Sequence, residues 1–212
     1  MKKSKYIDHT LLKADATSEQ IKKLCKEAVE NDFKSVCDNS SYLKLCKKEL
    51  EGTDILTCCV VGFPLGMMST EAKIFETRYC IENGADEIDM VINVGRLKEG
   101  DDEYVYNEIK ALKEVCGDKV LKVIIETCLL TDEEKVRVTK LIMKAKADFV
   151  KTSTGFSTGG ATFEDVKLLA DTVKGQIKIK AAGGVRTPED FDRMIELGAS
   201  RIGTSSGTKL IK

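Results

Sequence analysis

The sequence has a single histidine, His9, and none of its eight cysteines falls in a C-x-x-C spacing. A zinc site built from cysteine and histidine therefore has almost no ligands available, and we expect no metal. Catalysis by a Ser-His-Asp or Cys-His arrangement would depend on His9 alone, and this residue stands between Asp8 and Thr10. We expect His9 to be a hydrogen-bonded structural residue. The scattered cysteines are expected to be reduced thiols that act as small apolar residues.

The chain also lacks an excess of charge of either sign and any long hydrophobic run. Its 34 Lys and Arg residues nearly balance its 35 Asp and Glu residues, and the net charge is −1. This balance gives no general attraction to nucleic acid or to an anionic membrane surface. No segment approaches the roughly 18 consecutive apolar residues of a membrane-spanning helix, and no apolar segment follows the basic residues 1–5. We therefore expect a cytoplasmic protein that binds neither nucleic acid nor membrane.

What the sequence does contain is a regular alternation of short β-branched runs with amphipathic helical stretches over its 212 residues. With 42 % hydrophobic residues, a chain of this length can bury a full core. The expected strands are residues 6–8, 35–37, 55–61, 87–92, 120–125, 149–151, 177–180 and 201–203. Several of these runs are almost wholly apolar, which is typical of strands that are buried on both faces.

The spacing of the strands indicates the fold class. One strand and one helix recur about every 27 residues, which is the rhythm of a parallel (β/α)8 barrel. We therefore predict a single (β/α)8 (TIM) barrel domain over residues 1–212. An open, doubly wound parallel sheet is the alternative that periodicity alone leaves open.

Capping residues mark the ends of the expected helices. Residues 17–20 and 131–134 have the spacing of a capping box, in which a threonine and the third residue after it satisfy each other's free amides. Thr187 stands before a proline, a typical start of a helix. Gly84 and Gly198 each follow a helical stretch and can adopt a positive φ, so they predict helix ends.

Three charged residues end or interrupt apolar runs, and the active site of a barrel of this kind lies at the C-terminal ends of its strands. Lys151 ends one expected strand and enters a segment rich in Ser, Thr and Gly. Lys180 ends the next strand, so the two lysines are expected to be neighbours. Asp89 lies inside an apolar strand, where a carboxylate is costly unless it is paired.

Each of these residues also has a structural explanation. A lysine at the end of a strand can extend to solvent, and Asp89 can belong to a structural ion pair. Alternation along the strand places Lys178 on the same face as Lys180, which a filled barrel interior tolerates poorly. Either the strand twists out of register at its end, or Lys178 lies lower in the barrel and has a partner.

Two glycine-containing segments follow the last two expected strands. In barrels of this kind, the loops after strands 7 and 8 and the start of an extra helix form a recurrent phosphate site. Glycines let backbone N–H groups approach phosphate oxygens closely, and serine hydroxyls add further donors. The residues concerned are Gly183, Gly184, Gly203, Thr204, Ser205 and Ser206.

Six segments of the chain resemble those of the deoxyribose-phosphate aldolase family. They are residues 8–13 (DHTLLK), 60–66 (VVGFPLG), 87–91 (EIDMV), 150–156 (VKTSTGF), 180–186 (KAAGGVR) and 202–207 (IGTSSG). The resemblance implies a (β/α)8 barrel and a class I lyase that works without metal or other cofactor. Such an enzyme cleaves 2-deoxy-D-ribose 5-phosphate reversibly to D-glyceraldehyde 3-phosphate and acetaldehyde, in the catabolism of deoxyribose phosphate. The resemblance also suggests a homodimer.

By the same resemblance, Lys151 is the Schiff-base lysine, and Asp89 and Lys180 are proton donors and acceptors. Thr152 and Cys37 are expected to contact the substrate together with the two glycine-containing segments. An amine attacks a carbonyl only as the free base, and a nearby cation together with partial desolvation favours that form. Lys180 is suitably placed to be that cation for Lys151.

The chain departs from the family pattern at two places. Ala14 stands where a proline is common, and residues 38–40 replace an apolar residue followed by Asn-Pro. We expect Asp38 at the mouth of the second strand, where it would either repel a phosphorylated substrate or face solvent. Two other functions are compatible with phosphate loops on a barrel: an isomerase or synthase, and a non-catalytic protein that binds sugar phosphates. Neither of these requires a pair of lysines.

Overall fold

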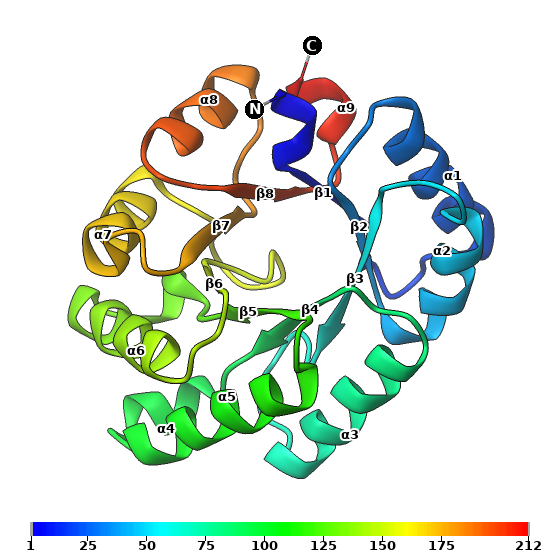
Figure 1. Cartoon of the computed structure of the whole chain (residues 1–212). Helices are drawn as coiled ribbons and strands as arrows, with labels where there is room; N and C mark the ends of the chain where they lie inside the picture. The colour runs from blue at the N-terminus through cyan, green and yellow to red at the C-terminus, as the bar shows by residue number, and fades with distance from the viewer. Residues whose placement is uncertain (1, 212) are drawn as a thin grey trace.

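Eight parallel strands close into a barrel in which each strand pairs with the next along the chain and β8 pairs with β1 (Figure 1). This arrangement confirms the predicted (β/α)8 barrel and rules out the open sheet. The computed structural model describes residues 2–211. The strands are β1 (Ile7–Thr10), β2 (Ser35–Asp38), β3 (Leu56–Val61), β4 (Glu87–Val91), β5 (Val120–Ile124), β6 (Phe149–Lys151), β7 (Lys178–Ala182) and β8 (Arg201–Thr204).

The helices form a ring around the barrel (Figure 1). They are α1 (Ser18–Glu30), α2 (Leu43–Glu49), α3 (Thr70–Glu82), α4 (Val94–Lys98), α5 (Asp102–Cys116), α6 (Asp132–Lys144), α7 (Phe163–Val173), α8 (Pro188–Glu196) and α9 (Gly207–Leu210). Three short 3-10 helices are η1 (Lys3–Tyr6), η2 (Ser40–Tyr42) and η3 (Thr127–Leu129). The rhythm of one α-helix per strand is broken between β4 and β5, where α4 precedes α5; α9, the helix that follows β8, is only four residues long.

The predicted helix signals are confirmed. The capping boxes at residues 17–20 and 131–134 are both formed, and Thr187 forms a third one with Asp190. Gly84 and Gly198 have φ values of 100° and 114°, so each provides the left-handed turn that ends its helix.

Some predicted strand limits are wrong. The first strand is not residues 6–8, because Tyr6 belongs to η1 and β1 continues through Thr10. The last two strands also run further than expected. Ala182 pairs with Gly203, and Thr204 pairs with a residue of β1. Gly203 and Thr204 are therefore strand residues, because parallel pairing with both neighbours continues to the mouth of the barrel.

The apolar core lies between the barrel and the helix ring. Strand residues that point outward are fully buried there, among them Val36, Val61, Ile88, Val123, Val150 and Ile202. All eight cysteines are free, and only Cys128 is exposed, so the others are packed as small apolar groups as expected. Within residues 2–211, no helix combines the length and the apolar character needed to cross a membrane.

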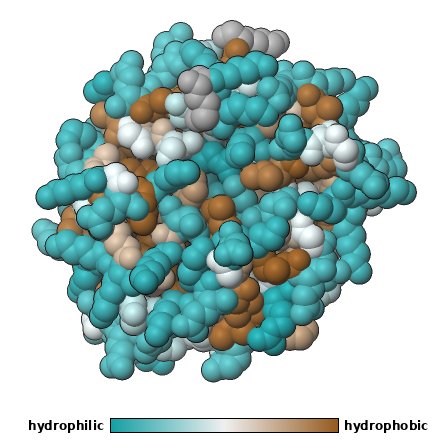
Figure 2. All heavy atoms as spheres, in the orientation of Figure 1, coloured by the Kyte–Doolittle hydropathy of each residue, from teal (hydrophilic) through white to brown (hydrophobic). Residues whose placement is uncertain are grey.

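Several large apolar side chains are exposed on and before α3. Phe75 and Tyr79 of α3 are 71 % and 39 % exposed, and Leu65 and Met67 of the preceding loop are 75 % and 64 % exposed. Figure 2 shows hydrophobic side chains among hydrophilic ones on the face that it views, some of them below and to the right of the centre. Exposed apolar groups that gather in this way are typical of a contact surface.

Candidate active site

A cavity of about 480 Å³ opens at the C-terminal mouth of the barrel. The ends of β1, β6, β7 and β8 and the loops after them line it. Among the lining residues are Lys151, Phe156, Gly183, Gly184, Ser205 and Ser206. The fold therefore brings one of the predicted lysines and both glycine-containing segments to one cavity, although they are distant in the sequence.

Lys151, Asp89 and Lys180 meet below this cavity. The Lys151 and Lys180 amines lie 2.6 Å and 2.8 Å from the same oxygen of Asp89, Oδ2. Lys180 also lies 2.6 Å from Oδ2 of Asp8. All four side chains are buried. The two lysines are thus neighbours as expected, but the structure places a shared carboxylate against both of them.

A second layer of charges lies deeper in the barrel, and the sequence analysis missed it. Lys122 lies 2.8 Å from Oδ1 of Asp89 and 2.6 Å from Glu87. Arg201 forms ion pairs with Glu87 and, at 3.2 Å, with Asp8. Lys122 sits in an apolar strand in the same way as Asp89, so the signal that identified Asp89 could have found it. Asp8 is followed by His9 and Thr10 in β1 and shows no such contrast. We call these groups, with Lys151 and Lys180, the barrel charge network.

The electrostatics of the network favour the ionised forms of Asp8, Asp89, Lys122 and Lys180. Burial alone would raise the pKa of Asp89, but the three lysines around it lower that pKa well below its ordinary value. The pKa of Asp8 is likewise lowered by Arg201 and by Lys180, against the effect of burial. Burial acts to lower the pKa values of Lys122 and Lys180, and the neighbouring carboxylates raise both above the ordinary value. Lys122 and Lys180 therefore stay protonated.

Lys178 does not share the upper part of the barrel with Lys180. It lies lower and has a partner, the ring of Phe149. It is exposed at the start of β7, and its amine lies 5.7 Å from the centre of the Phe149 ring. Lys122 and Arg201 lie 6.0 Å and 5.9 Å from the same ring. Phe149 thus separates the barrel charge network from the lower opening, and its π face is favourable for the cations around it.

Thr152 and Cys37 are not among the residues that line the cavity. The Thr152 hydroxyl donates to the Ala182 carbonyl at 3.3 Å and accepts from the Ala182 amide at 3.1 Å, so it joins β6 to β7. Cys37 is buried behind the cavity. The hydrogen-bonding contact with the Cys58 side chain and the charge of nearby Lys180 lower the pKa of the Cys37 thiol, against the effect of burial.

Within residues 2–211, one group of side chains has the donor types and spacing of a metal site. The ligand atoms of Cys37, Cys58 and Asp89 lie within 4.8 Å of one another. Both oxygens of Asp89 are already occupied, because Oδ1 accepts from Lys122 and Cys58 and Oδ2 accepts from Lys151 and Lys180. The positive charges and the saturated carboxylate make this group a poor fit for a cation.

Asp38 neither reaches the cavity nor faces solvent, so both expectations for it are wrong. It ends β2 and points outward, where it is fully buried against α2. The thiol of Cys46 donates to its Oδ2 at 2.9 Å, while its Oδ1 has no hydrogen-bond partner. Burial raises the pKa of Asp38 to about 7.

The glycine-containing segments present free donors to the cavity. Gly183 and Gly184 have φ values of 73° and 81°, a turn that L side chains rarely adopt. The backbone amides of Gly183, Gly184 and Ser205 lie in loops. Within residues 2–211, none of them donates to a backbone carbonyl in a turn, loop or helix cap. The Ser206 amide donates to the Thr204 hydroxyl at 3.0 Å, which orders the loop before α9. Such a set of amides and hydroxyls along the wall of the cavity suits an anion.

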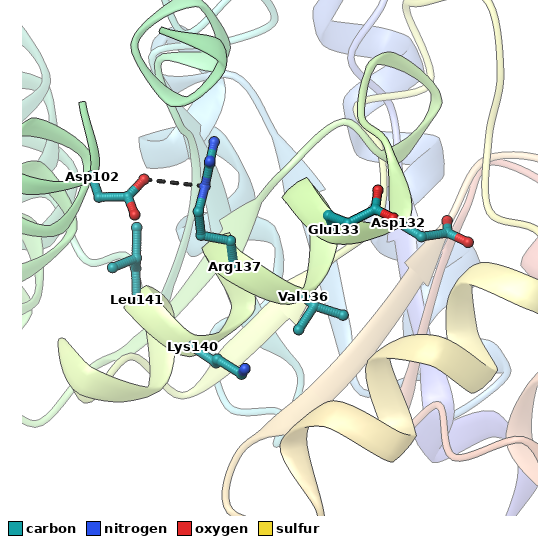
Figure 3. A pocket seen from close by; sticks show the side chains of 7 residues that line it. All are labelled: Asp102, Asp132, Glu133, Val136, Arg137, Lys140 and Leu141. Atoms are coloured by element: carbon teal, nitrogen blue, oxygen red, sulfur yellow. Dashed lines mark ion pairs between the residues drawn. The ribbon is translucent and has the colours of Figure 1, made fainter. Parts of the chain in front are cut away.

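A larger hollow, of about 600 Å³, lies on the outer surface along α6 (Figure 3). The charged pair in it joins Asp102 to Arg137 at 3.2 Å and links α5 to α6. Asp132, Glu133 and Lys140 project at its edges (Figure 3). The hollow is shallow and lacks convergent polar groups, so we assign no chemistry to it.

His9 has the structural role that the sequence predicts. It is buried, and its Nε2 lies 2.7 Å from a carboxylate oxygen of Glu27 on α1. Its ring packs against Phe33, with the ring centres 5.1 Å apart. His9 thus attaches α1 to β1 and takes no place in the cavity.

Comparisons with known proteins agree with this geometry. A model of the DeoC/LacD family of aldolases matches residues 3–210. The chain is 61 % identical over 212 residues to a deoxyribose-phosphate aldolase of Finegoldia magna, with 100 % of each chain covered. A solved structure named QR15, an aldolase, is 38 % identical with a TM-score of 0.94, covering 98 % of this chain and 93 % of that one. The deoxyribose phosphate aldolase of Aeropyrum pernix, described as a tetramer, is 33 % identical with a TM-score of 0.92, covering 99 % and 89 %.

Proposed function

The chain belongs to the DeoC/LacD family of aldolases, and on that premise we propose that it cleaves 2-deoxy-D-ribose 5-phosphate reversibly, through a Schiff base on Lys151. The products are D-glyceraldehyde 3-phosphate and acetaldehyde, and the reaction belongs to the catabolism of deoxyribose phosphate. The chemistry needs no cofactor, because the iminium ion itself withdraws the electrons. The free, mostly buried cysteines fit a reducing compartment, and we place the enzyme in the cytoplasm.

The observation that carries this proposal is the charge balance of the barrel charge network. It holds four cationic side chains and three carboxylates, all of them buried, so full ionisation leaves one positive charge in excess. Lys180 contacts two carboxylates, Lys122 contacts two closely and a third at 3.9 Å, and Arg201 keeps its proton in proteins. Lys151 contacts Asp89 alone. It is therefore the amine that becomes the free base at the least electrostatic cost.

The proposed reaction uses this amine. Lys151 attacks the C1 aldehyde of the open-chain sugar, and loss of water gives an iminium ion. The bond between C2 and C3 then breaks as the C3 hydroxyl loses its proton, and the electron pair moves into an enamine. Asp89 and Lys180 carry protons, through water, from the C3 hydroxyl and later to the enamine carbon. Hydrolysis of the resulting iminium releases acetaldehyde and restores Lys151.

The proposed phosphate site lies at the other side of the same cavity. The free amides of Gly183, Gly184 and Ser205 and the hydroxyl of Ser206 would hold the phosphate of the sugar. Arg186, at the rim, adds a positive charge. A phosphate fixed there sets the position of C1 relative to the reactive amine and reduces the number of unproductive poses.

We also propose that the enzyme is a homodimer that associates through α3. The exposed side chains of this helix include Phe75 and Tyr79, with Glu71 and Arg78 beside them. Two copies of α3 that cross antiparallel would bring Glu71 of one copy against Arg78 of the other at both ends of an apolar contact. A surface that is complementary to itself in this way suits a two-fold dimer.

Borohydride reduction in the presence of acetaldehyde tests the proposed activity. An enzyme that forms a Schiff base is converted to a stable secondary amine, and mass spectrometry of a digest should locate the added group on Lys151. The Lys151→Ala variant should show neither trapping nor turnover of the phosphorylated sugar. An isomerase, a synthase or a non-catalytic sugar-phosphate-binding barrel would not be trapped, and that result would contradict the proposal.

A further inference from the structure

Glu126 is a buried acidic residue in an unusual backbone conformation, and the proposed mechanism gives it no part. It follows the end of β5 with φ 52° and ψ 68°, which is left-handed. An L side chain adopts this conformation at a cost, since its Cβ crowds the following carbonyl oxygen. Such strain is retained where the surrounding structure requires it, and it concentrates at functional sites.

The carboxylate of Glu126 is bonded to the segment that follows Lys151. Its Oε1 accepts from the Thr154 amide at 3.2 Å, and its Oε2 accepts from the Thr154 hydroxyl at 2.5 Å. The oxygen of that hydroxyl in turn accepts from the Phe156 amide at 3.0 Å. One carboxylate therefore holds Thr154 by its amide and its hydroxyl and, through that hydroxyl, the backbone at Phe156.

The strained conformation is what allows these bonds. The residues on either side of Glu126 stay paired with β6, because the Ile125 amide donates to the Lys151 carbonyl at 3.0 Å and the Thr127 amide donates to the Thr152 carbonyl at 2.9 Å. Between two such bonds, the left-handed turn directs the Glu126 side chain across β6 toward the segment 152–156. The backbone and the side chain of one short stretch thus hold both Lys151 and the segment after it.

The segment 152–156 forms part of the wall of the active-site cavity. Thr154, Gly155 and Phe156 line the cavity together with Lys151. The Phe156 ring meets the Phe63 ring edge to face, with the ring centres 5.2 Å apart. Phe156 is half exposed, and the bond of its amide to Thr154 and this ring contact help to hold it in place.

We propose that Glu126 is a positioning residue of the aldolase reaction, which holds the wall formed by residues 154–156 against a sugar bound to Lys151. The inference rests on the proposed function. Glu126 itself contacts neither the lysine amine nor the glycine-containing segments. Loss of Glu126 should therefore slow the reaction of a long substrate that extends along this wall. It should not slow the reaction of acetaldehyde, which occupies only the space around the amine.

Two measurements on Glu126→Gln test this role. The amide keeps the length of the side chain but puts an NH2 donor where an acceptor faces the donors of Thr154. We expect kcat/KM for 2-deoxyribose 5-phosphate to fall roughly 10- to 100-fold, in the range expected for a small misplacement of the substrate. The rate at which borohydride traps acetaldehyde on Lys151 should stay at the wild-type value.

Further variants separate the carboxylate from the backbone. Thr154→Val removes the hydroxyl at nearly constant shape, and its loss should not add to that of Glu126→Gln in the double variant, since both break the same bond. Glu126→Gly adopts the left-handed conformation without strain, whereas Glu126→Ala does not. Equal losses of kcat/KM in these two variants would assign the effect to the carboxylate. If Glu126→Gln fails to fold, Glu126→Gly and Glu126→Ala replace it in the test of the carboxylate.

The outcomes are distinct. A large loss with the phosphorylated sugar at an unchanged trapping rate supports the positioning role. An unchanged kcat/KM in every Glu126 variant overturns it, as does an equal loss of turnover and trapping, which would indicate a general loss of structure. Absence of trapping in the wild-type enzyme would instead refute the aldolase function itself.

Discussion

Asp89 is the point at which the buried charges of the barrel converge, and its two oxygens connect the reactive end of the network to the deeper one. Because Oδ2 is shared by Lys151 and Lys180, neither lysine can change its charge without affecting the other. The protonation of Lys151 is therefore a property of the whole network. Variants that raise or lower the net charge of the network should shift the pH dependence of trapping at Lys151 in opposite directions.

Lys180→Leu and Asp8→Asn form such a pair. Removal of Lys180 leaves three cations and three carboxylates, so Lys151 is balanced when protonated, and the pH midpoint of acetaldehyde trapping should rise by about two units. At neutral pH this corresponds to trapping roughly 100-fold slower. Removal of the Asp8 charge leaves a larger positive excess, and the midpoint should move to lower pH. Wild-type pH profiles in both variants would show that the network does not control the amine.

The phosphate site can be tested at Ser206, which lines the cavity beside the loop before α9. Ser206→Asp places a fixed anion where the phosphate is proposed to lie, so KM for the phosphorylated sugar should rise steeply by charge repulsion. Slow turnover of unphosphorylated 2-deoxyribose should survive. Ser41→Asp, which adds the same charge at an exposed position of η2, is the control. Equal losses on both substrates would contradict the assignment.

The functional role of a single residue can be predicted from the sequence when its side chain differs in polarity from the residues around it. Lys151 and Lys180 are recognisable because each is a charge that ends an expected strand, and Asp89 because it is a charge inside an apolar one. Lys122 has the same contrast, but as one lysine in a strand it has an ordinary explanation until its partners are known. Glu126 gave no signal at all, since its left-handed conformation and its bond to Thr154 arise only from the pairing of β5 with β6.

Between β2 and α2, the buried Asp38 should make the stability of the fold depend on pH. In the unfolded chain an aspartate ionises above about pH 4. In the folded protein, burial raises the pKa of Asp38 to about 7, so the folded state keeps the proton over this interval. The unfolded state then binds fewer protons, and the free energy of unfolding falls as pH rises from about 4 to about 7.

Asp38→Asn, a neutral side chain of the same shape, isolates this contribution. Its free energy of unfolding in urea should match that of the wild type near pH 4 and exceed it by up to about 4 kcal/mol at pH 8. Other titrating groups are common to both proteins, so the difference between them reports on Asp38. A difference that is the same at every pH would show that the carboxyl is not protonated in the folded state.

The limits of a helix or strand are predicted well where residues close in the sequence determine them. They are predicted poorly where pairing with a neighbouring strand determines them. The caps at residues 17–20 and 131–134 act within one turn of helix, and both are formed. The ends of β1 and β8 depend on how far neighbouring strands continue to pair, which the chain does not show locally. The orientation of Asp38 was missed for the same reason, because an extra residue of β2 turns its side chain to the outer face.

The whole molecule has almost no net charge, and hydrophobic side chains are scattered among hydrophilic ones on the face that Figure 2 views. Phe75 of α3, 71 % exposed, is among the most exposed of the large apolar side chains. The rhythm of eight strand–helix units predicts a barrel, but periodicity alone also allows an open sheet, and the pairing of β8 with β1 decides between them. The assembly of barrels could not be predicted, since a contact between copies depends on which side chains remain exposed after folding. The proposed contact makes a definite prediction for α3.

Sedimentation velocity over a range of concentrations should show a dimer for the wild type. Phe75→Glu places a charge at the centre of the contact and should give a monomer, whereas Val29→Glu, at an exposed apolar position of α1, should leave the dimer intact. Arg78→Glu should also dissociate the dimer, because two carboxylates then face each other at each end. Exchange of both charges, Glu71→Arg with Arg78→Glu, restores opposite signs and should restore the dimer. A wild-type monomer at all concentrations, or a charge exchange that fails to recover what Arg78→Glu loses, would place the interface elsewhere or exclude it.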